Sequence, residues 1–133
     1  MSDITLVSED GKIEVSRPTN SNLSALQYHF VRLDTSEEVV ACGLNEKPLG
    51  ILQDAPNGSS TEKVATVRIQ GMSKLSIAET VVFGNFLTST AASKGEVCDA
   101  AGEEYGAKAL TSGESGDLIA VLIAHGEVEA TDA

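Results

Sequence analysis

The stretch ATVRIQGMSKL, residues 65–75, decides the fold class. Over residues 65–70, Ala, Val and Ile alternate with Thr, Arg and Gln. Because successive side chains of a strand point to opposite faces, this alternation predicts a strand with one buried and one solvated face. We expect one strand at residues 65–70 and another at residues 72–75, with Gly71 between them.

Similar short apolar runs recur along the chain, with Gly, Ser, Thr, Asn and Asp between them. Turn residues at intervals of about 8–12 positions are typical of an all-β sandwich or barrel. The sequence therefore predicts an all-β fold: a small β-barrel or sandwich of short strands, with at most one or two short helical turns. The expected strands are residues 4–7, 12–15, 28–33, 39–42, 49–53, 65–70, 72–75, 86–89, 96–98, 106–110 and 118–124.

Turn chemistry supports this fold class, because Asp-Gly and Asn-Gly pairs tolerate the positive φ that tight hairpins need. Short helical turns are expected in two places, one capped by Asn22 within residues 17–27 and one within residues 75–82. The predicted hairpin turns are residues 9–12, 56–58 and 93–95.

Residues 48–71 and 105–126 share an order of glycine, strand, turn, strand and glycine. Two related hairpins of this kind would pair to build a small barrel. Two unrelated β-hairpins share much of the same pattern, so both interpretations stay open. The last of these strands, residues 118–124, is apolar on both faces. It is either a central strand or a strand whose second face meets another subunit.

The composition limits both the core and the partners. The chain has 133 residues, of which 4% are aromatic and none is Trp, so its core must be made of small aliphatic side chains. Such a core favours association with other subunits for stability. The net charge of −11 argues against binding to nucleic acid. No apolar run approaches the ~20 residues of a membrane span, so we expect no membrane partner.

Negative charge is concentrated toward the C-terminus, where residues 95–133 contain nine acidic residues and one lysine. We expect three regions: an N-terminal arm at residues 1–19, a β-barrel domain at residues 20–125, and an acidic C-terminal tail at residues 126–133.

The residue types that carry chemistry are scattered. His29 and His125 are far apart, and Cys42 and Cys98 lack the close His or Cys companions of a zinc site. Two reduced thiols serving as small apolar side chains are the expectation. Lys74 lies between two β segments, as the modified lysine of a biotinyl or lipoyl carrier hairpin does, but the usual flanking residues are missing. We expect no enzyme, no cofactor and no metal.

Five motifs in chain order resemble the tailed-phage capsid decoration proteins, also called head cement proteins. The resemblance covers about residues 20–124, although residues 77–84 lack the Gly-rich character often seen there. The motifs are Leu23, Ser24, Gln27 and Tyr28 followed by Phe30, Val31, Arg32 and Leu33; residues 48–53 (PLGILQ) with Pro56; residues 65–74 (ATVRIQGMSK); residues 105–110 (YGAKAL); and residues 116–122 (GDLIAVL).

The resemblance implies a structural virion protein that is made in the host cytoplasm and binds the exterior of an assembled head. It would bind the major capsid protein as a homotrimer and stabilise the capsid lattice. We expect Ile4, Leu6 and Val7 of the arm to contact the capsid. The residues expected to pack the barrel or the trimer seam are Tyr28, Phe30, Leu33, Leu118, Val121 and Leu122.

An adhesion module on the virion surface that binds host glycan is the alternative. Glycan sites usually use exposed aromatic side chains, and this chain has two Tyr, three Phe and no Trp. The composition therefore favours the structural interpretation.

Overall fold

The computed structural model describes residues 11–128, which form nine β-strands and no helix. All pairings between these strands are antiparallel, so the all-β prediction is confirmed. The strands are β1 (Ile13–Pro18), β2 (Phe30–Leu33), β3 (Val39–Ala41), β4 (Gly50–Leu52), β5 (Val64–Ser76), β6 (Phe86–Ser89), β7 (Gly95–Val97), β8 (Glu104–Ala109) and β9 (Leu118–Glu127).

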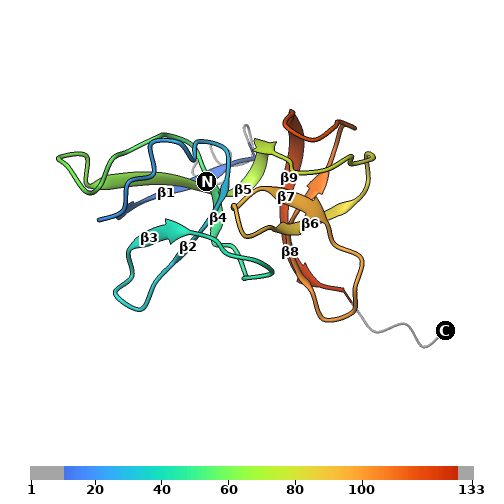
Figure 1. Ribbon diagram of the computed structural model, residues 1–133, viewed down its shortest axis with the longest axis horizontal. Coiled ribbons are helices and arrows are strands. Elements are labelled where there is room, and N and C mark those ends of the chain that lie inside the picture. Colours follow the sequence, from blue (N-terminus) through green and yellow to red (C-terminus); the bar gives the residue numbers. More distant parts are fainter. Residues whose placement is uncertain (1–10, 129–133) are drawn as a thin grey trace, which may run out of the picture.

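The long strand β5 holds the molecule together. It runs through Gly71 for 13 residues, where the sequence predicted two separate strands. Gly71 has φ of 100°, a conformation that glycine adopts at little cost. Residues 64–70 pair with β1 and β4, whereas residues 71–76 pair with β9. Figure 1 shows β5 passing between a half formed by β1–β4 and a half formed by β6–β9.

Both predicted helical turns are wrong. In residues 75–82, β5 continues to residue 76, and bridges from Ile77 to Gly95 and from Val81 to Gly113 follow. The Ile77, Ala78 and Val81 amides donate to carbonyls of residues 117, 95 and 113, so they are not available for a helical turn. In residues 17–27, Asn22 Oδ1 does accept the Ser24 amide at 3.1 Å, but the turn that follows, closed by the Leu26 amide on the Leu23 carbonyl, does not continue as a helix.

Two predicted boundaries also change. The strand expected at residues 28–33 begins at Phe30, because Tyr28 has φ of 66° and cannot extend it. Residues 13–18, inside the predicted arm of residues 1–19, form β1 and pair along β5. An arm must therefore end before residue 13, and residues 1–10 lie outside the described part of the chain.

The strand order is β3-β2-β4-β5-β9-β8-β6-β7, with β1 also paired to β5. The order β5-β4-β2-β3 on one side of the sheet corresponds to the order β9-β8-β6-β7 on the other. In this correspondence β9 is the counterpart of the first part of β5. We call residues 13–70 the first repeat and residues 71–127 the second repeat. Residues 71–76 of β5 take the place in the second repeat that β1 has in the first.

The registers of corresponding strands agree. Val31 lies opposite Ala41 in the β2–β3 hairpin, and Leu87 lies opposite Val97 in the β6–β7 hairpin. Each residue of the second pair comes 56 positions after its counterpart in the first (31 and 87, 41 and 97). All three residue pairs of the two hairpins obey the same offset, so the hairpins are equivalent.

The remaining pairings correspond in the same way. Ile51 lies opposite Arg68 in the first repeat, and Lys108 lies opposite Leu122 in the second. The offsets here are 57 positions (51 and 108) and 54 positions (68 and 122). The predicted hairpins at residues 48–71 and 105–126 do pair side by side through β5 and β9, but the repeating unit is larger and includes five strands.

Turn contacts repeat even where the side chains differ. Asp34 Oδ1 accepts the amides two and four residues later at 2.8 and 3.0 Å. Thr90 Oγ1 does the same at 3.2 and 3.1 Å. Both turns contain a residue in the left-handed region, Glu37 with φ of 63° and Ser93 with φ of 68°. A duplicated backbone is therefore preserved by different residues with the same hydrogen-bonding function.

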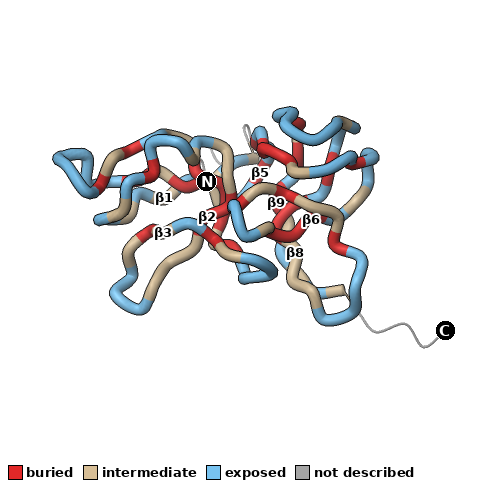
Figure 2. Tube along the Cα trace, in the orientation of Figure 1, coloured by how far each residue is buried: buried red, intermediate tan, exposed pale blue. Residues whose placement is uncertain are grey.

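Each repeat is a curled sheet with its own set of buried residues, which Figure 2 shows in red along the chain. The two edges of each sheet approach one another. Ile77 bridges to Gly95 in the second repeat, and Thr19 Oγ1 donates to the Val39 carbonyl at 2.8 Å in the first. The first core contains Leu23, Val31, Val39, Leu52, Ala65 and Val67. The second contains Leu75, Ile77, Val81, Leu87, Ala107, Ala109, Ile119, Val121 and Ile123.

We expect Gly71→Ala to lower the free energy of unfolding by about 2 kcal/mol, through a strained φ together with a steric clash. A Cβ at residue 71 would collide with the Gly11 carbonyl oxygen. Gly116→Ala is the matched control, because Gly116 has φ of 93° and no atom within 4 Å of the place that the added methyl group would take. It should cost about 1 kcal/mol. Urea unfolding followed by far-UV circular dichroism measures both, and equal losses would contradict the clash.

Candidate functional site

The two repeats meet through one face of the first. Phe30 and Ile51 are fully buried and Cys42 is 1% exposed, yet none of the three belongs to the first core. They pack into the hydrophobic cluster of the second repeat. We call this contact the repeat interface.

Polar contacts fix the repeat interface. The Phe30 amide donates to the Ser93 carbonyl at 2.8 Å. The Cys42 carbonyl accepts the Ser93 hydroxyl at 2.6 Å and, more weakly, the Ser89 hydroxyl at 3.4 Å. Gly106 lets the repeats come close, because a Cβ there would lie 2.7 Å from Pro48 Cγ. Small residues on the second repeat therefore receive the apolar face of the first.

The same face of the second repeat is open. Met72 lies opposite Leu122, Leu122 opposite Lys108, and Lys108 opposite Phe86. Directly opposite residues of antiparallel strands share a face of the sheet. Met72 is 57% exposed, Leu122 40% and Phe86 37%. We call Met72, Leu122, Lys108 and Phe86 the outer row.

Aromatic contacts order one end of the outer row. The Phe86 and Tyr105 rings lie 4.2 Å apart between centroids at an angle of 32°. Lys108 Nζ lies 5.7 Å from the Phe86 ring centroid. An apolar row with one cation and a stacked aromatic pair has the composition of a protein-binding surface.

The corresponding row of the first repeat is not exposed in the same way. Glu14 lies opposite Arg68, Arg68 opposite Ile51, and Ile51 opposite Phe30. The Arg68 Nε donates to Glu14 Oε2 at 2.9 Å, so this end is satisfied by an ion pair. The other end, Ile51 and Phe30, is covered by the second repeat. Equivalent positions are thus buried in one repeat and exposed in the other.

The residues predicted to pack the barrel or the trimer seam divide between the interior and the surface. Phe30 is buried at the repeat interface and Val121 in the second core. Leu33 is half-buried and packs against the first core. Tyr28 is half-buried outside the strands, with Lys74 Nζ 5.5 Å from its ring centroid.

The strand predicted to be apolar on both faces is β9, which lies centrally between β5 and β8. Val121 points into the core, whereas Leu118 is 52% and Leu122 is 40% exposed. One face of β9 is therefore apolar and open. The predicted capsid contacts Ile4, Leu6 and Val7 lie outside the described residues.

Sequence reasoning missed Met72, Phe86 and Lys108, which complete the outer row. A signal for them was present. Phe30 and Phe86 are 56 positions apart, as are Cys42 and Cys98. This shared offset would have paired Phe86 with Phe30, but it could not have shown which of the two is exposed.

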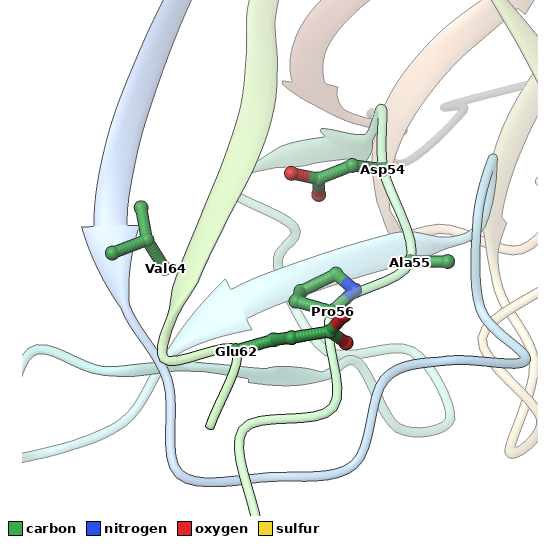
Figure 3. A pocket seen from close by; sticks show the side chains of 5 residues that line it. All are labelled: Asp54, Ala55, Pro56, Glu62 and Val64. Carbon is green, nitrogen blue, oxygen red and sulfur yellow. The ribbon is translucent and has the colours of Figure 1, made fainter. Parts of the chain in front are cut away.

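Two shallow hollows occur at equivalent places and carry no chemistry of their own. Asp54, Ala55, Pro56, Glu62 and Val64 line the first, of about 270 Å³ (Figure 3). Both of its carboxylates already accept backbone amides, Asp54 from Thr66 at 3.1 Å and Glu62 from Asn57 at 2.8 Å.

The second hollow, of about 390 Å³, is lined in part by Ser112 and Gly113. These residues come 57 positions after Ala55 and Pro56 of the first. The hollows therefore follow from the repeated loops of the fold.

Titratable groups show no catalytic arrangement among residues 11–128. Burial raises the pKa of the Cys42 and Cys98 thiols to about 11, so both stay protonated at neutral pH. Burial also lowers the pKa of His29, against the opposing effect of the Gln27 carbonyl. In the same residues, no three His, Cys, Asp or Glu side chains gather in a way that could hold a metal ion. Nor does this range contain a helix that could cross a membrane.

Comparison with known proteins gives a likeness of fold. No protein-family model matches the chain, and no curated protein matches it either. Among solved structures, the chain is similar to the head fiber gp8.5 N base of bacteriophage phi29, with a TM-score of 0.67. The match covers 90% of this chain and 99% of that one, at 13% sequence identity. At this identity the likeness shows a shared fold, and membership of the decoration protein family stays a prediction.

Proposed function

We propose that this chain is a structural protein of a phage virion that binds the exterior of the assembled head. The observation that carries the proposal is the fold shared with the phi29 head fiber gp8.5 N base over 90% of the chain. The ordered motifs that resemble decoration proteins support the same location independently. In this role the protein binds the major capsid protein as a homotrimer, stabilises the capsid lattice and makes or breaks no covalent bond.

The surface of the second repeat suits this role. The outer row across β5, β9, β8 and β6 presents the exposed apolar side chains of Met72, Leu122 and Phe86 for contact with another protein subunit, with Lys108 between Leu122 and Phe86. Complete burial of an exposed side chain of this size contributes roughly 1.5–3 kcal/mol, and these side chains, already partly buried, would each contribute a part of it. Three copies bound together multiply a modest single contact into tight attachment, because the second and third contacts form at high effective concentration.

Binding to heads tests the proposal. Purified protein is mixed with expanded, undecorated heads, and the bound fraction is measured by sedimentation over a range of concentrations. We expect saturable binding with a copy number divisible by three, a raised melting temperature of the head, and weak binding to unexpanded precursors. Absence of binding to expanded heads would overturn the proposal, and equal binding to precursors would overturn its dependence on the mature lattice.

The arm is tested in the same assay. Deleting residues 2–10 removes Ile4, Leu6 and Val7 but leaves β1, which begins at Ile13, intact. We expect at least a tenfold loss of affinity for heads, because a short apolar segment can add as a strand to a neighbouring sheet. Replacing the same residues by a Gly-Ser segment of equal length is the control for chain length. Unchanged occupancy would show that the arm makes no contact.

The glycan-binding alternative has one observation in its favour, the 69% exposure of Phe83. Exposed aromatic rings stack on sugars, so a glycan array read with the native protein and with Phe83→Ser separates the two functions. A glycan signal that the substitution removes, together with no binding to heads, would replace the structural proposal.

A further inference from the structure

The two repeats differ in what covers the same face. In the first repeat, Phe30 and Ile51 are covered by the second repeat of the same chain. In the second repeat, their counterparts Phe86 and Lys108 are exposed. The first repeat shows that this face of the fold can pack against another repeat, so the exposed face of the second repeat is suited to the same kind of contact.

We propose that the outer row of one copy packs against the first repeat of a second copy, head to tail, in the manner of the repeat interface. This inference rests on the homotrimer of the proposed function, and it names the surface that joins the copies. A head-to-tail contact is heterologous, with two different patches in each interface, and it closes into a ring when its rotation is that of a threefold axis.

The receiving side is defined by the counterparts of Ser89, Ser93 and Gly106. In the repeat interface the Ser93 carbonyl accepts the Phe30 amide, the Ser89 hydroxyl donates to the Cys42 carbonyl, and Gly106 lies against Pro48. We call their first-repeat counterparts, which are Leu33, Glu37 and Leu49, the receiving surface. Leu33 and Leu49 are half-buried against the first core, and Glu37 is exposed. Because the two leucines are larger than their counterparts Ser89 and Gly106, the contact between copies is less close than the repeat interface.

Charge distinguishes the contact between copies from the contact within the chain. The outer row has Lys108 where the first repeat has the buried Ile51. The receiving surface has Glu37 where the second repeat has the buried Ser93. Glu37 Oε1 already accepts from Arg17 Nη2 at 3.1 Å within the chain, so a lysine from a second copy would join this exposed ion pair. In the contact between copies, Lys108 thus takes the place of Ile51 and Glu37 takes the place of Ser93. Opposite charges across an interface fix its register and exclude wrong partners.

A second charge pair agrees with this arrangement. Lys47 Nζ lies 3.9 Å from Glu104 Oε1 across the repeat interface. The two residues occupy equivalent positions, 57 apart, because Lys47 precedes β4 as Glu104 precedes the corresponding part of β8. The intermolecular equivalent of their contact places Glu104 of one copy near Lys47 of the next. In this contact the second repeat supplies the anion from the outer-row side and the first repeat of the next copy supplies the cation, so the two charges are again opposite.

Charge reversal tests the inference. Lys108→Glu, Glu37→Lys and the double variant are compared with the native protein by sedimentation equilibrium at low salt. We expect each single reversal to weaken trimer formation about tenfold or more, and the double variant to restore it to within about threefold of the native value. Glu114→Lys, on the exposed loop of residues 111–117, is the control for the change in net charge.

Each result decides the matter. Rescue by the double variant supports the head-to-tail contact. Singles that behave like Glu114→Lys, a double variant that is weaker than either single, or a native protein that stays monomeric up to high micromolar concentration would each overturn it.

Head binding, measured in parallel, separates this inference from the proposed function. If the trimer responds as expected but no variant and no native protein binds heads, the proposed function fails and the contact between copies stands. If native protein binds heads while the charge reversals leave trimer formation unchanged, the location on the head stands and the outer row has another occupant. A loss of head binding in Lys108→Glu without any change in trimer formation assigns the row to the capsid and overturns the inference.

Discussion

Replacing Phe30 by alanine is expected to lower the free energy of unfolding by about 4 kcal/mol, whereas Phe86→Ala should cost less than about 1 kcal/mol. The two residues occupy equivalent positions, 56 apart, in β2 and β6. Phe30 is fully buried between the repeats, so its truncation leaves a cavity there. Phe86 is 37% exposed and loses mainly its stacking on Tyr105.

Urea unfolding followed by far-UV circular dichroism measures both variants. Phe30→Leu is the matched control, since it keeps most of the buried volume and should cost about 1–2 kcal/mol. Similar losses for Phe30→Ala and Phe86→Ala would mean that the two faces are equally buried. That result would contradict both the repeat interface and the open outer row.

The strands were the predictable part of the fold. Alternation over residues 65–70 indicated a strand, and turn chemistry placed a turn at residues 93–95, where Ser93 takes the positive φ. These features depend only on residues close together in the sequence, so they can be predicted from the sequence alone. The continuation of β5 through Gly71 was not predictable in this way, because glycine at this point is compatible with both a turn and an extended strand.

The duplication was only partly visible in the sequence. The hairpins at residues 48–71 and 105–126 resemble one another, but the full unit is preserved by backbone contacts. Asp34 and Thr90 accept the same pair of turn amides with different side chains. Tyr28 and Gly84 both have positive φ and both donate to a carbonyl at 2.7 Å. A repeat conserved in hydrogen bonds and not in residue types leaves little trace in a single sequence.

The outer row could not be predicted from periodicity. Met72, Phe86, Lys108 and Leu122 come from four strands, and only the register of the sheet brings them side by side. Their exposure also depends on tertiary contacts, since the equivalent face of the first repeat is buried. The residues that sequence reasoning did select, Leu118 and Leu122, were visible because β9 is apolar on both faces.

Replacing Ile51 by lysine is expected to destabilise the protein by about 5 kcal/mol, which is enough to unfold a domain of ordinary stability. Ile51 is fully buried at the repeat interface beside Phe30, among apolar side chains of the second repeat. The reciprocal change, Lys108→Ile, should alter stability by less than about 0.5 kcal/mol, because Lys108 is exposed. Reciprocal exchanges at equivalent positions are thus expected to have very unequal effects on stability.

Limited proteolysis and urea unfolding measure this pair, and failure of the Ile51→Lys chain to fold at 37 °C counts as the expected result. Ile51→Val separates charge from volume, with an expected cost of about 1 kcal/mol. A well-folded Ile51→Lys protein would mean that water reaches residue 51 and that the repeats do not pack there. The inference about the outer row would then lose its template, because it depends on the first repeat showing how this face is covered.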